Sequence, residues 1–430
     1  MEKMRFHILG MPHTKTVKYW ATCAYTQKII KLCSMLHSLG HEVYHYGVEG
    51  SEVECTHDVI VMSSTKHDAH FGTDWHDNHT FDVKDAHHKE WYDTTAAKLD
   101  KNLKKQDFIL CMWGDGHIGV LNRIPNVEDR AIIVEPGIGY GIESMISRAS
   151  NPKLGAGLGI GIEYHPYRVF ESYTWMSYCY GRGEVAGMGC FTEIPTFDAV
   201  IPNYWDPNDF IFSEEKDDYF LFFGRCGVEK GTLIAAEVCR QAGVKLVVAG
   251  QNREGAQHLD GYDVDFRGFV DNKTRAELMS KAQAVLVPTQ YHEPFGGVAV
   301  EAQMCGTPVI SVDWGVFNET VLHGHTGYRC RTLDHYLYAI ENVKNLDPHK
   351  IRDWAVQNFS LERVAPMYQE YFSMLYSKWH HGWFDSRKDV DGEWLKKHYP
   401  QNIGWVDADE FKRRQDANPD KNKEINNGRI

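Results

Sequence analysis

The sequence predicts an α/β protein with two consecutive parallel-sheet domains, and three observations lead to this fold class. The chain opens with a strand at Arg5–Gly10, an amphipathic helix at Ala21–Leu39 and a second strand at His41–Val48. Short apolar runs then follow at helix-length intervals, as buried parallel strands do. They are Asp58–Ser63, Asp107–Met112 and Ala131–Glu135. The same alternation begins again at Tyr219–Gly224.

The second half of the chain is predicted as a separate domain, because a stretch rich in Pro and Asp at 201–209 precedes it. Its further strands are expected at Lys245–Gly250, Val264–Gly268, Ala284–Pro288 and Pro308–Asp313. Its helices are expected at Thr232–Ala242, Asn272–Ala282 and Gly297–Cys305. Thr274, which has capping-box spacing to Glu277, or Asn272 is the expected cap of the second helix.

The C-terminal part turns helical from about Asp334 and includes an amphipathic helix at Leu361–Trp379. We therefore divide the chain into three parts. An N-terminal Rossmann-like domain at 1–205 contains a His-rich insertion at about 64–90, a C-terminal Rossmann-like domain follows at 206–379, and a C-terminal extension occupies 380–430.

Composition narrows the class of protein. With 43% hydrophobic and 24% charged residues, the chain is an ordinary globular protein rather than a disordered, collagen-like or coiled-coil one. No run approaches the roughly 18 apolar residues of a transmembrane helix, and the N-terminus lacks a signal peptide's apolar region. Ten cysteines without a CxxC pair indicate reduced thiols. We expect a cytoplasmic protein, and a net charge of −13 argues against nucleic acid as its partner.

The segment 291–302, YHEPFGGVAVEA, lies between a predicted strand and a predicted helix. Gly296 and Gly297 at the helix entrance allow a ligand close to the backbone, where free N–H groups suit phosphate or sugar oxygens. Glu293 and Glu301 can border one crevice at the carboxyl end of the sheet. Because a carboxylate beside phosphate is unfavourable, they are expected to accept hydrogen bonds from hydroxyl groups. The alternative interpretation is that Glu293 is an acidic residue of a loop and that Glu301 is a charge near the helix N-terminus, where it interacts favourably with the helix dipole.

A second candidate segment, 222–231, is the glycine-rich turn FFGRCGVEKG between a predicted strand and helix. Arg225 and Lys230 flank this turn, and two cations beside a helix N-terminus can neutralise a diphosphate. The turn is not a Walker loop, since GxxxxGK[ST] is absent from it. A surface turn with solvated charges is the alternative interpretation.

These segments resemble a known family. Glu293 and Glu301 form an E-x7-E pattern, and EPFGGVAVEAQMCGTPVI followed by GHTGY resembles the donor-site signature of retaining GT-B glycosyltransferases of family 4. The FGRCGVEKG turn, the RGFV segment at Arg267–Val270 and the helical stretch FSLERVAPMYQEYF resemble it in the same order. The resemblance extends from about Tyr219 to Trp379. It implies two Rossmann-like domains facing across a cleft, the first binding an acceptor and the second a nucleotide sugar.

The resemblance also implies roles for individual residues. Arg225 and Lys230 would bind the diphosphate, Glu293 the donor-sugar hydroxyls and Glu301 the ribose hydroxyls. Donor contacts of the backbone are implied around Phe295, Gly296, Gly297, Phe269 and Val270, the last two near the base. The implied reaction retains the anomeric configuration, with positive groups stabilising the departing nucleoside diphosphate. It needs no metal and no cofactor besides the donor substrate.

The first half of the chain differs from the family and offers other candidates. In place of a glycine-rich loop after the first strand it has MPHTKT at 11–16. His117 follows a predicted strand end and is predicted to be catalytic, orienting the donor sugar or the acceptor hydroxyl. A structural histidine is an equally good interpretation. The turns at 134–140 and 165–168 are further candidates for the cleft.

Two groups of residues have the side-chain types of a metal site. The histidines of the insertion could ligate zinc, but their spacing matches no recognised finger, so a loop facing the acceptor is preferred. They are His57, His67, His70, His76, His79, His87 and His88. Asp263 and Asp265 have the letters of a metal-binding DxD motif, but they lie on a predicted strand and are discounted.

Together these patterns predict a retaining glycosyltransferase that moves a sugar from a nucleoside-diphosphate sugar to a hydroxyl acceptor. The sequence leaves four kinds of acceptor open: a glycan, a lipid, a small molecule or a modified nucleobase. A GT-B-like nucleotide-sugar epimerase or a phosphorylase is one alternative, although we can assign neither a pyridoxal lysine nor paired acid and base groups. A non-catalytic module that binds sugar nucleotides is the other.

Overall fold

The computed structural model of the chain describes residues 3–20, 23–72, 85–138, 167–183, 197–251 and 259–379. These residues form two compact units. The first unit takes in the described part of Met1–Asp206, the segment His292–Gly297 and helix α14 (Leu361–Lys378). The second unit takes in the described part of Pro207–Tyr291 and Val298–Asn358.

The first unit is built on a seven-stranded sheet in the order β3-β2-β1-β4-β5-β6-β7, in which all paired strands are parallel. In chain order the strands are β1 (Arg5–Leu9), β2 (Glu42–Val48), β3 (His57–Met62), β4 (Asp107–Leu110), β5 (Ala131–Pro136), β6 (Tyr167–Phe170) and β7 (Ala199–Val200). The strands are short and mostly buried, which is typical of parallel sheets that carry helices on both faces.

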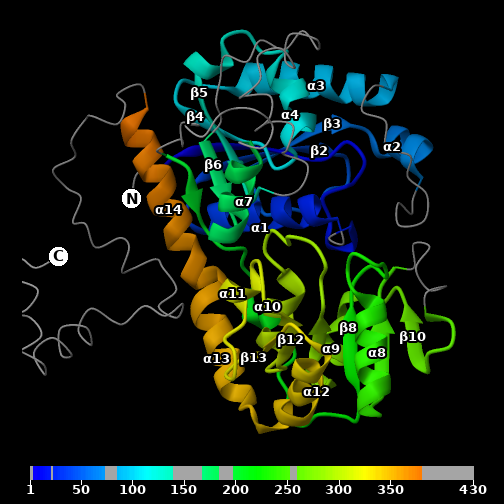
Figure 1. Ribbon diagram of the computed structural model, residues 1–430. Helices are drawn as coiled ribbons and strands as arrows, with labels where there is room; N and C mark the ends of the chain where they lie inside the picture. The colour runs from blue at the N-terminus through cyan, green and yellow to red at the C-terminus, as the bar shows by residue number, and fades with distance from the viewer. Residues whose placement is uncertain are drawn as a thin grey trace, which may run out of the picture. The chain divides into compact units, whose positions relative to one another are not determined.

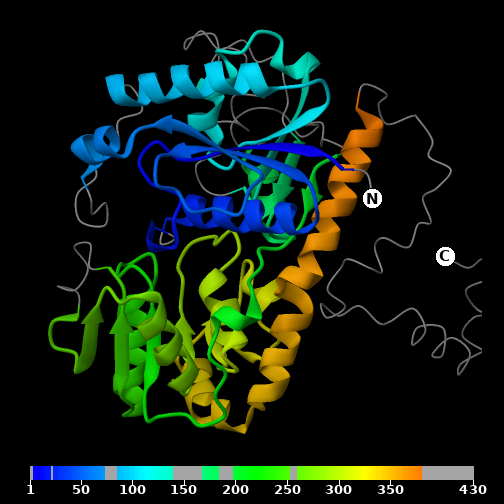
Figure 2. The ribbon, with the colours of Figure 1, turned by 180° about the vertical axis from the view of Figure 1, so that it is seen from behind.

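Helices cover both faces of this sheet (Figure 1). The helices are α1 (Ala24–Ser38), α2 (Ser64–Phe71), α3 (Ala86–Asn102), α4 (Gly114–Leu121) and α7 (Tyr173–Gly183), with short 3₁₀ turns at Lys18–Trp20 and Val127–Asp129. One apolar core joins α1 and α14 to the sheet, while another joins α3 and α4 to its opposite face. Figure 2 shows α1 and α3 on opposite sides of the strands.

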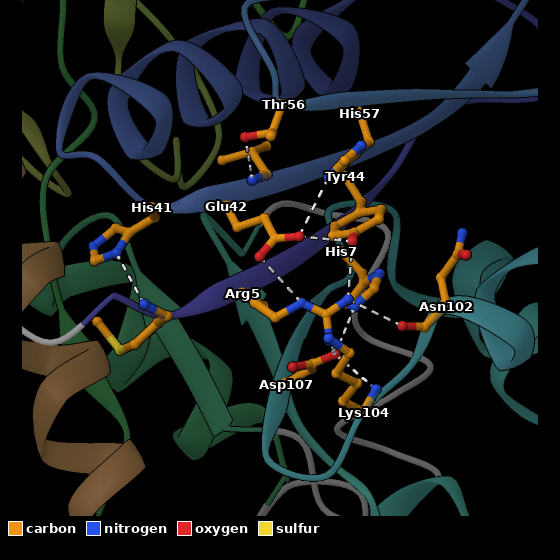
Figure 3. Close-up of polar contacts among 12 residues, drawn as sticks. Arg5, His7, His41, Glu42, Tyr44, Thr56, His57, Asn102, Lys104 and Asp107 are labelled. Carbon is orange, nitrogen blue, oxygen red and sulfur yellow. Dashed lines mark hydrogen bonds and ion pairs between the residues drawn. The ribbon is translucent and has the colours of Figure 1, made fainter.

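The amino-terminal ends of β1 to β4 are closed by a cluster of polar side chains (Figure 3). Arg5 donates to Asp107 Oδ2 at 2.9 Å and to Tyr44 Oη at 3.0 Å. His7 Nε2 lies 3.0 Å from the same Asp107 oxygen. The Tyr44 ring stacks against both His7 and His57, with ring centres 4.7 and 4.3 Å apart. Because these groups satisfy one another, the opposite edge, at the carboxyl ends of the strands, is the one whose loops can carry a binding site.

The second unit contains a six-stranded parallel sheet in the order β10-β9-β8-β11-β12-β13. Its strands are β8 (Phe220–Phe223), β9 (Leu246–Ala249), β10 (Val264–Gly268), β11 (Val285–Val287), β12 (Val309–Val312) and β13 (Gly327–Cys330). Its helices are α8 (Thr232–Ala242), α9 (Asn272–Lys281), α10 (Gly297–Met304), α11 (Phe317–Thr320), α12 (Leu333–Asn342) and α13 (Pro348–Phe359), with 3₁₀ turns at Pro207–Asp209 and Val343–Asn345. One core joins α8 and α12 to the sheet, and a second joins α9, α10 and α11 to its other face.

The predicted fold class of two parallel Rossmann-like sheets followed by helices is confirmed. The predicted ranges of α8 and β10 agree with the structure at both ends, and most other elements are one to three residues shorter in the structure than predicted. The predicted cap of α9 was wrong. Its N-cap is Asp271, whose side chain accepts a hydrogen bond from the Thr274 N–H at 2.7 Å. Asp271 stands three residues before Thr274 and one before Asn272, and an aspartate caps at least as well as a threonine, so Thr274 supplies the capped amide instead.

Helix α14 shows why the predicted domain ranges differ from the contact-defined units. The helix begins at Ser360, whose side chain accepts from the Arg363 N–H, and it buries Val364, Tyr368 and Phe372 in the same core as β1 and α1. The apolar stripe was visible in the sequence, but nothing local indicates which sheet it covers. The ranges 1–205, 206–379 and 380–430 as functional domains stay a prediction. Across the described residues, no helix has the length and apolar character needed to cross a membrane.

Candidate functional site

The order of the second sheet reverses between β8 and β11, since the chain runs outward to β9 and β10 on one side and to β12 and β13 on the other. In open α/β sheets the crevice outside the carboxyl ends of the strands at such a point is the usual ligand site. The predicted diphosphate turn follows β8, and the predicted sugar-binding segment follows β11. The topology therefore brings the two predicted segments to neighbouring strand ends.

The turn after β8 packs closely against the chain that leaves β11. Gly231 has φ 76°, and a Cβ atom added to it would lie 2.1 Å from the Pro288 carbonyl oxygen, so only glycine fits there. The Gln290 N–H donates to the Glu229 carbonyl at 2.8 Å. These contacts fix the backbone between Arg225 and α8.

The two predicted cations occupy this fixed turn. The Arg225 side chain is exposed and Lys230 is half-buried. The Gly227 N–H donates to Thr232 Oγ1 at 3.1 Å, so the first residue of α8 ties the turn to the helix N-terminus. Two cations next to the positive end of a helix are suited to an anionic group such as a diphosphate.

The second predicted carboxylate, Glu301, lies in α10 and is only 5% exposed. It forms an ion pair with Arg275 of α9. The Arg275 guanidinium lies 5.1 Å from the centre of the Phe223 ring, at the end of β8. Burial lowers the pKa of Arg275 to about 10, so the side chain stays charged at neutral pH. The predicted ribose carboxylate is therefore held by a cation at the same sheet edge as the diphosphate turn.

The other predicted carboxylate, Glu293, lies in the segment His292–Gly297, which belongs to the first unit. Ser172 Oγ donates to the Pro294 carbonyl at 2.7 Å. The Phe295 ring stacks on Trp205 with ring centres 5.7 Å apart. Glu293 itself is half-buried, and Gly296 has φ 73°. These contacts fix the backbone that directly follows Glu293 within the first unit.

The residues predicted to lie near the base follow β10. Phe269 is 50% exposed and Val270 is half-buried, and both directly precede Asp271, the N-cap of α9. An exposed aromatic ring at the carboxyl end of a strand has the chemistry to stack on a planar group. The base contact stays a prediction.

In the structure, His117 is enclosed and hydrogen-bonded to the backbone. Its ring is fully buried, with Nδ1 accepting from the Trp113 N–H at 3.3 Å and Nε2 donating to the Gly10 carbonyl at 3.0 Å. Burial lowers its pKa to about 4, so the ring is neutral at neutral pH. Because both ring nitrogens bind backbone, the geometry supports the structural interpretation and a role in holding the loop after β1 rather than contact with substrate.

The His-rich insertion was expected to form a loop, and its described parts correct that expectation. His67 lies in α2, while His87 and His88 lie in α3, and all three side chains are buried. His70 stacks on His87 with ring centres 4.1 Å apart. Apolar packing with Phe71 explains why these histidines lie inside.

Within the described ranges, no group of three or more His, Cys, Asp or Glu side chains is arranged to hold a metal ion. The predicted independence of metal stays a prediction. His76, His79 and the positions 139–140 and 165–166 of the two candidate turns lie outside the described residues, whereas 134–136 belong to β5 and 167–168 to β6.

Arg275 and Tyr291 belong to this region but were not singled out from the sequence. An arginine in the first turns of a polar helix has the pattern of a solvated charge, and its partner Glu301 is 26 residues away along the chain. Tyr291 stood next to Glu293, but an aromatic residue in a loop has no specific signal. The ion pair between Arg275 and Glu301 could be identified only from the packing of α9 against α10.

Comparisons with known proteins bear on the second unit and on the fold. Residues 207–346 match the family described as glycosyl transferases group 1. A glycogen synthase of Mycobacterium tuberculosis is 32% identical over 126 residues, which are 26% of this chain and 30% of the relative. The match thus spans less than a third of that curated relative.

Solved structures extend the likeness to both sheets. A sucrose-phosphate synthase from Thermosynechococcus elongatus superposes with a TM-score of 0.60 at 16% identity, over 87% of this chain and 100% of the other. The Anabaena protein HepE in complex with UDP-glucose gives a TM-score of 0.58 at 15% identity, over 86% of this chain and 100% of the other. At such identities the likeness establishes the fold, which is GT-B as predicted.

Proposed function

We propose that the chain is a retaining glycosyltransferase that uses a nucleoside-diphosphate sugar, which agrees with the match of residues 207–346 to the glycosyl transferases group 1 family. The observation that carries this proposal is the position of Arg225 and Lys230 on a rigid turn at the switch point of the second sheet. That turn contacts the segment leading to Glu293, through the Gln290–Glu229 hydrogen bond.

The leaving group explains why cations are needed at this position. When the sugar departs, negative charge grows on the diphosphate, and fixed positive groups stabilise the transition state more than the ground state. Arg225 and Lys230 supply two such charges without a metal ion, and the N-terminus of α8 adds a dipole of the same sign. We assign leaving-group stabilisation to this turn.

The two carboxylates and the segment at Phe269 would bind the other parts of the donor, which are the sugar, the ribose and the base. Glu293, placed before Gly296 and Gly297, would accept hydrogen bonds from hydroxyls of the transferred sugar. Glu301 would accept them from the ribose, and the chain at Phe269 would lie against the base. The sheet order β10-β9-β8-β11 supports three of these assignments, because the segments assigned to the base, the diphosphate and the sugar follow the order of these groups along a donor molecule. The assignment of Glu301 rests on the family resemblance.

The donor to test first is UDP-glucose. The Anabaena protein HepE, which shares the fold, was solved in complex with UDP-glucose. The acceptor is a hydroxyl group whose carrier we leave open among glycan, lipid, small molecule and modified nucleobase. We place the reaction in the cytoplasm, because the described cysteines are free thiols and all but Cys55 are buried.

A thermal-shift and calorimetry screen tests the proposal. UDP, GDP, ADP and their glucose conjugates are the ligands, with uridine, guanosine and adenosine as controls that lack the diphosphate. A ligand at 100 times its dissociation constant stabilises the native state by about 2.7 kcal/mol. We expect one nucleoside diphosphate to bind clearly more tightly than its nucleoside. Equal binding of diphosphates and nucleosides would remove the assignment.

A further inference from the structure

Arg275 has no role in the function proposed above, yet its surroundings are those of the donor site. It lies in α9, the helix that begins directly after Phe269 and Val270. Its backbone N–H donates to the carbonyl of the N-cap Asp271 at 2.9 Å, so the residue stands one turn into the helix. Its side chain is 21% exposed.

Two contacts fix the guanidinium group. One is the ion pair between Arg275 Nη2 and Glu301 Oε2, whose side chain is 7% exposed. The other is the stacking of the guanidinium on Phe223, at 5.1 Å from the ring centre. Phe223 ends β8 and is followed by Gly224 and Arg225. Arg275 thus lies between the chain that carries the diphosphate turn and the carboxylate assigned to the ribose.

The burial of Glu301 shows why this arginine matters. The helix that carries it is buried on most sides, including Ala299, Val300 and Ala302, so Glu301 has little water to solvate its charge. An ionised carboxylate in such surroundings is strongly unfavourable unless a cation pairs with it. Arg275 supplies that cation.

We infer that Arg275 is a positioning residue for donor recognition: it keeps Glu301 charged and fixed in orientation, so that Glu301 can select a ribose over a deoxyribose. The inference rests on the proposed function, and it concerns which residue confers sugar selectivity at the nucleoside end of the site.

The chemistry of the pair supports this role. The guanidinium is a planar, rigid set of donors, and its stacking on Phe223 restricts it further, so a carboxylate bound to it has little rotational freedom. A carboxylate has about four acceptor positions, and an arginine on Oε2 does not use all of them. A fixed and charged acceptor discriminates strongly against an analogue without the hydroxyl, because the buried charge is then left without that partner.

The test measures dissociation constants of nucleoside diphosphates and of their 2′,3′-dideoxy counterparts by calorimetry, with uridine, guanosine and adenosine as the bases. Wild-type protein should bind the ribose form of its preferred diphosphate roughly 10- to 150-fold more tightly than the dideoxy form. Arg275→Gln should weaken binding of the ribose form and leave the dideoxy form unchanged, bringing the ratio to within about threefold of one.

Two further variants make the result specific. Arg275→Lys keeps the charge but loses the planar group, so it should show the same pattern with a smaller loss, and it carries the test if Arg275→Gln does not fold. Arg240→Gln breaks an exposed ion pair with Glu237 on α8 of the same unit and should leave the ratio unchanged.

The outcomes separate this inference from the function on which it rests. If the Arg275 variants weaken both forms equally, or keep the wild-type ratio, Arg275 is only structural and the inference is wrong. If wild-type protein binds a diphosphate but does not distinguish ribose from dideoxyribose, the inference fails while the proposed function stands. If wild-type protein binds no nucleoside diphosphate, both fail.

Discussion

Lys230 Nζ lies 4.8 Å from the centre of the Tyr291 ring, so the cation on the turn after β8 is in contact with the chain leaving β11. A cation over an aromatic face is attracted to it and loses part of its freedom. Tyr291 precedes His292 and Glu293 in the sequence. The charge assigned to the leaving group is therefore set in place by the chain that continues into the sugar-binding segment.

Removing both cations should weaken diphosphate binding selectively. In the double variant Arg225→Ala/Lys230→Ala, each lost charged contact is worth about 1.5–3 kcal/mol, so we expect at least a tenfold rise in the dissociation constant for the preferred nucleoside diphosphate. Binding of the nucleoside should not change. The matched control is Arg240→Ala/Lys344→Ala, which removes two exposed cations of the second unit. Equal diphosphate affinity in the two double variants would contradict the assignment.

The two glutamates should affect different kinetic parameters. Glu293→Gln should lower kcat, because the transferred sugar is where charge develops in the transition state. Glu301→Gln should raise KM for the donor, because a ribose contact is made equally before and during the reaction. Loss of one charged hydrogen bond corresponds to roughly 10- to 150-fold in the affected parameter. Glu237→Gln is the surface control. A fall in kcat for Glu301→Gln with none for Glu293→Gln would mean that the two ends are reversed.

Acid should destabilise the first unit through buried histidines. The pKa of His117 is lowered from 6.5 to about 4 by burial, and burial lowers that of His7 as well. The unfolded chain takes up protons below about pH 6.5 and the folded chain does not, so this stability is present above pH 6.5 and lost as pH falls toward 4. At pH 5, His117 alone accounts for about 2 kcal/mol.

Melting temperatures at pH 7 and pH 5 measure this effect. We expect His117→Asn to melt lower than wild type at pH 7 and to lose less on acidification. The same loss between pH 7 and pH 5 in both proteins would show that His117 does not titrate in this way.

The polar cluster of Figure 3 should contribute to the stability of the first unit. Asp107→Asn removes the charge that faces Arg5, whose side chain is 13% exposed, and we expect a loss of about 2 kcal/mol in the free energy of unfolding. Asp100→Asn is the matched control, because Asp100 pairs with Arg130 on the surface and should cost less than about 1 kcal/mol. Urea unfolding of both variants decides it, and equal losses would contradict the prediction.

Local patterns sufficed to predict most of the elements and their order. The runs that became β8, β9 and β11 are apolar, short and bounded by turn residues, and the helices between them have the period of a buried face. Strands β6 and β7 were not predicted, because the start of β6 was interpreted as a turn and β7 has only two residues. The cap of α9 was missed because three residues within four positions, Asp271, Asn272 and Thr274, are all common N-cap residues.

The parts of the site that could not be predicted depend on packing. Arg225, Lys230, Glu293 and Glu301 were visible because glycine-rich turns and spacing mark them. The ion pair of Arg275 with Glu301 joins two helices far apart in sequence, so no local pattern encodes it. His117 shows the reverse case: histidine is a common catalytic residue type, but both nitrogens of this ring are hydrogen-bonded to backbone groups.

The central claim is that the protein cleaves a nucleoside-diphosphate sugar with retention at the anomeric carbon, and proton NMR of the first sugar released from UDP-glucose tests it most directly. With wild-type protein at high concentration and water as the acceptor, we expect UDP and the α-anomer of glucose to form before mutarotation. The Arg225→Ala/Lys230→Ala variant should release much less, while Arg240→Ala/Lys344→Ala should match wild type. Release of the β-anomer first would contradict retention. Failure to consume UDP-glucose, GDP-glucose and ADP-glucose would contradict the proposed activity.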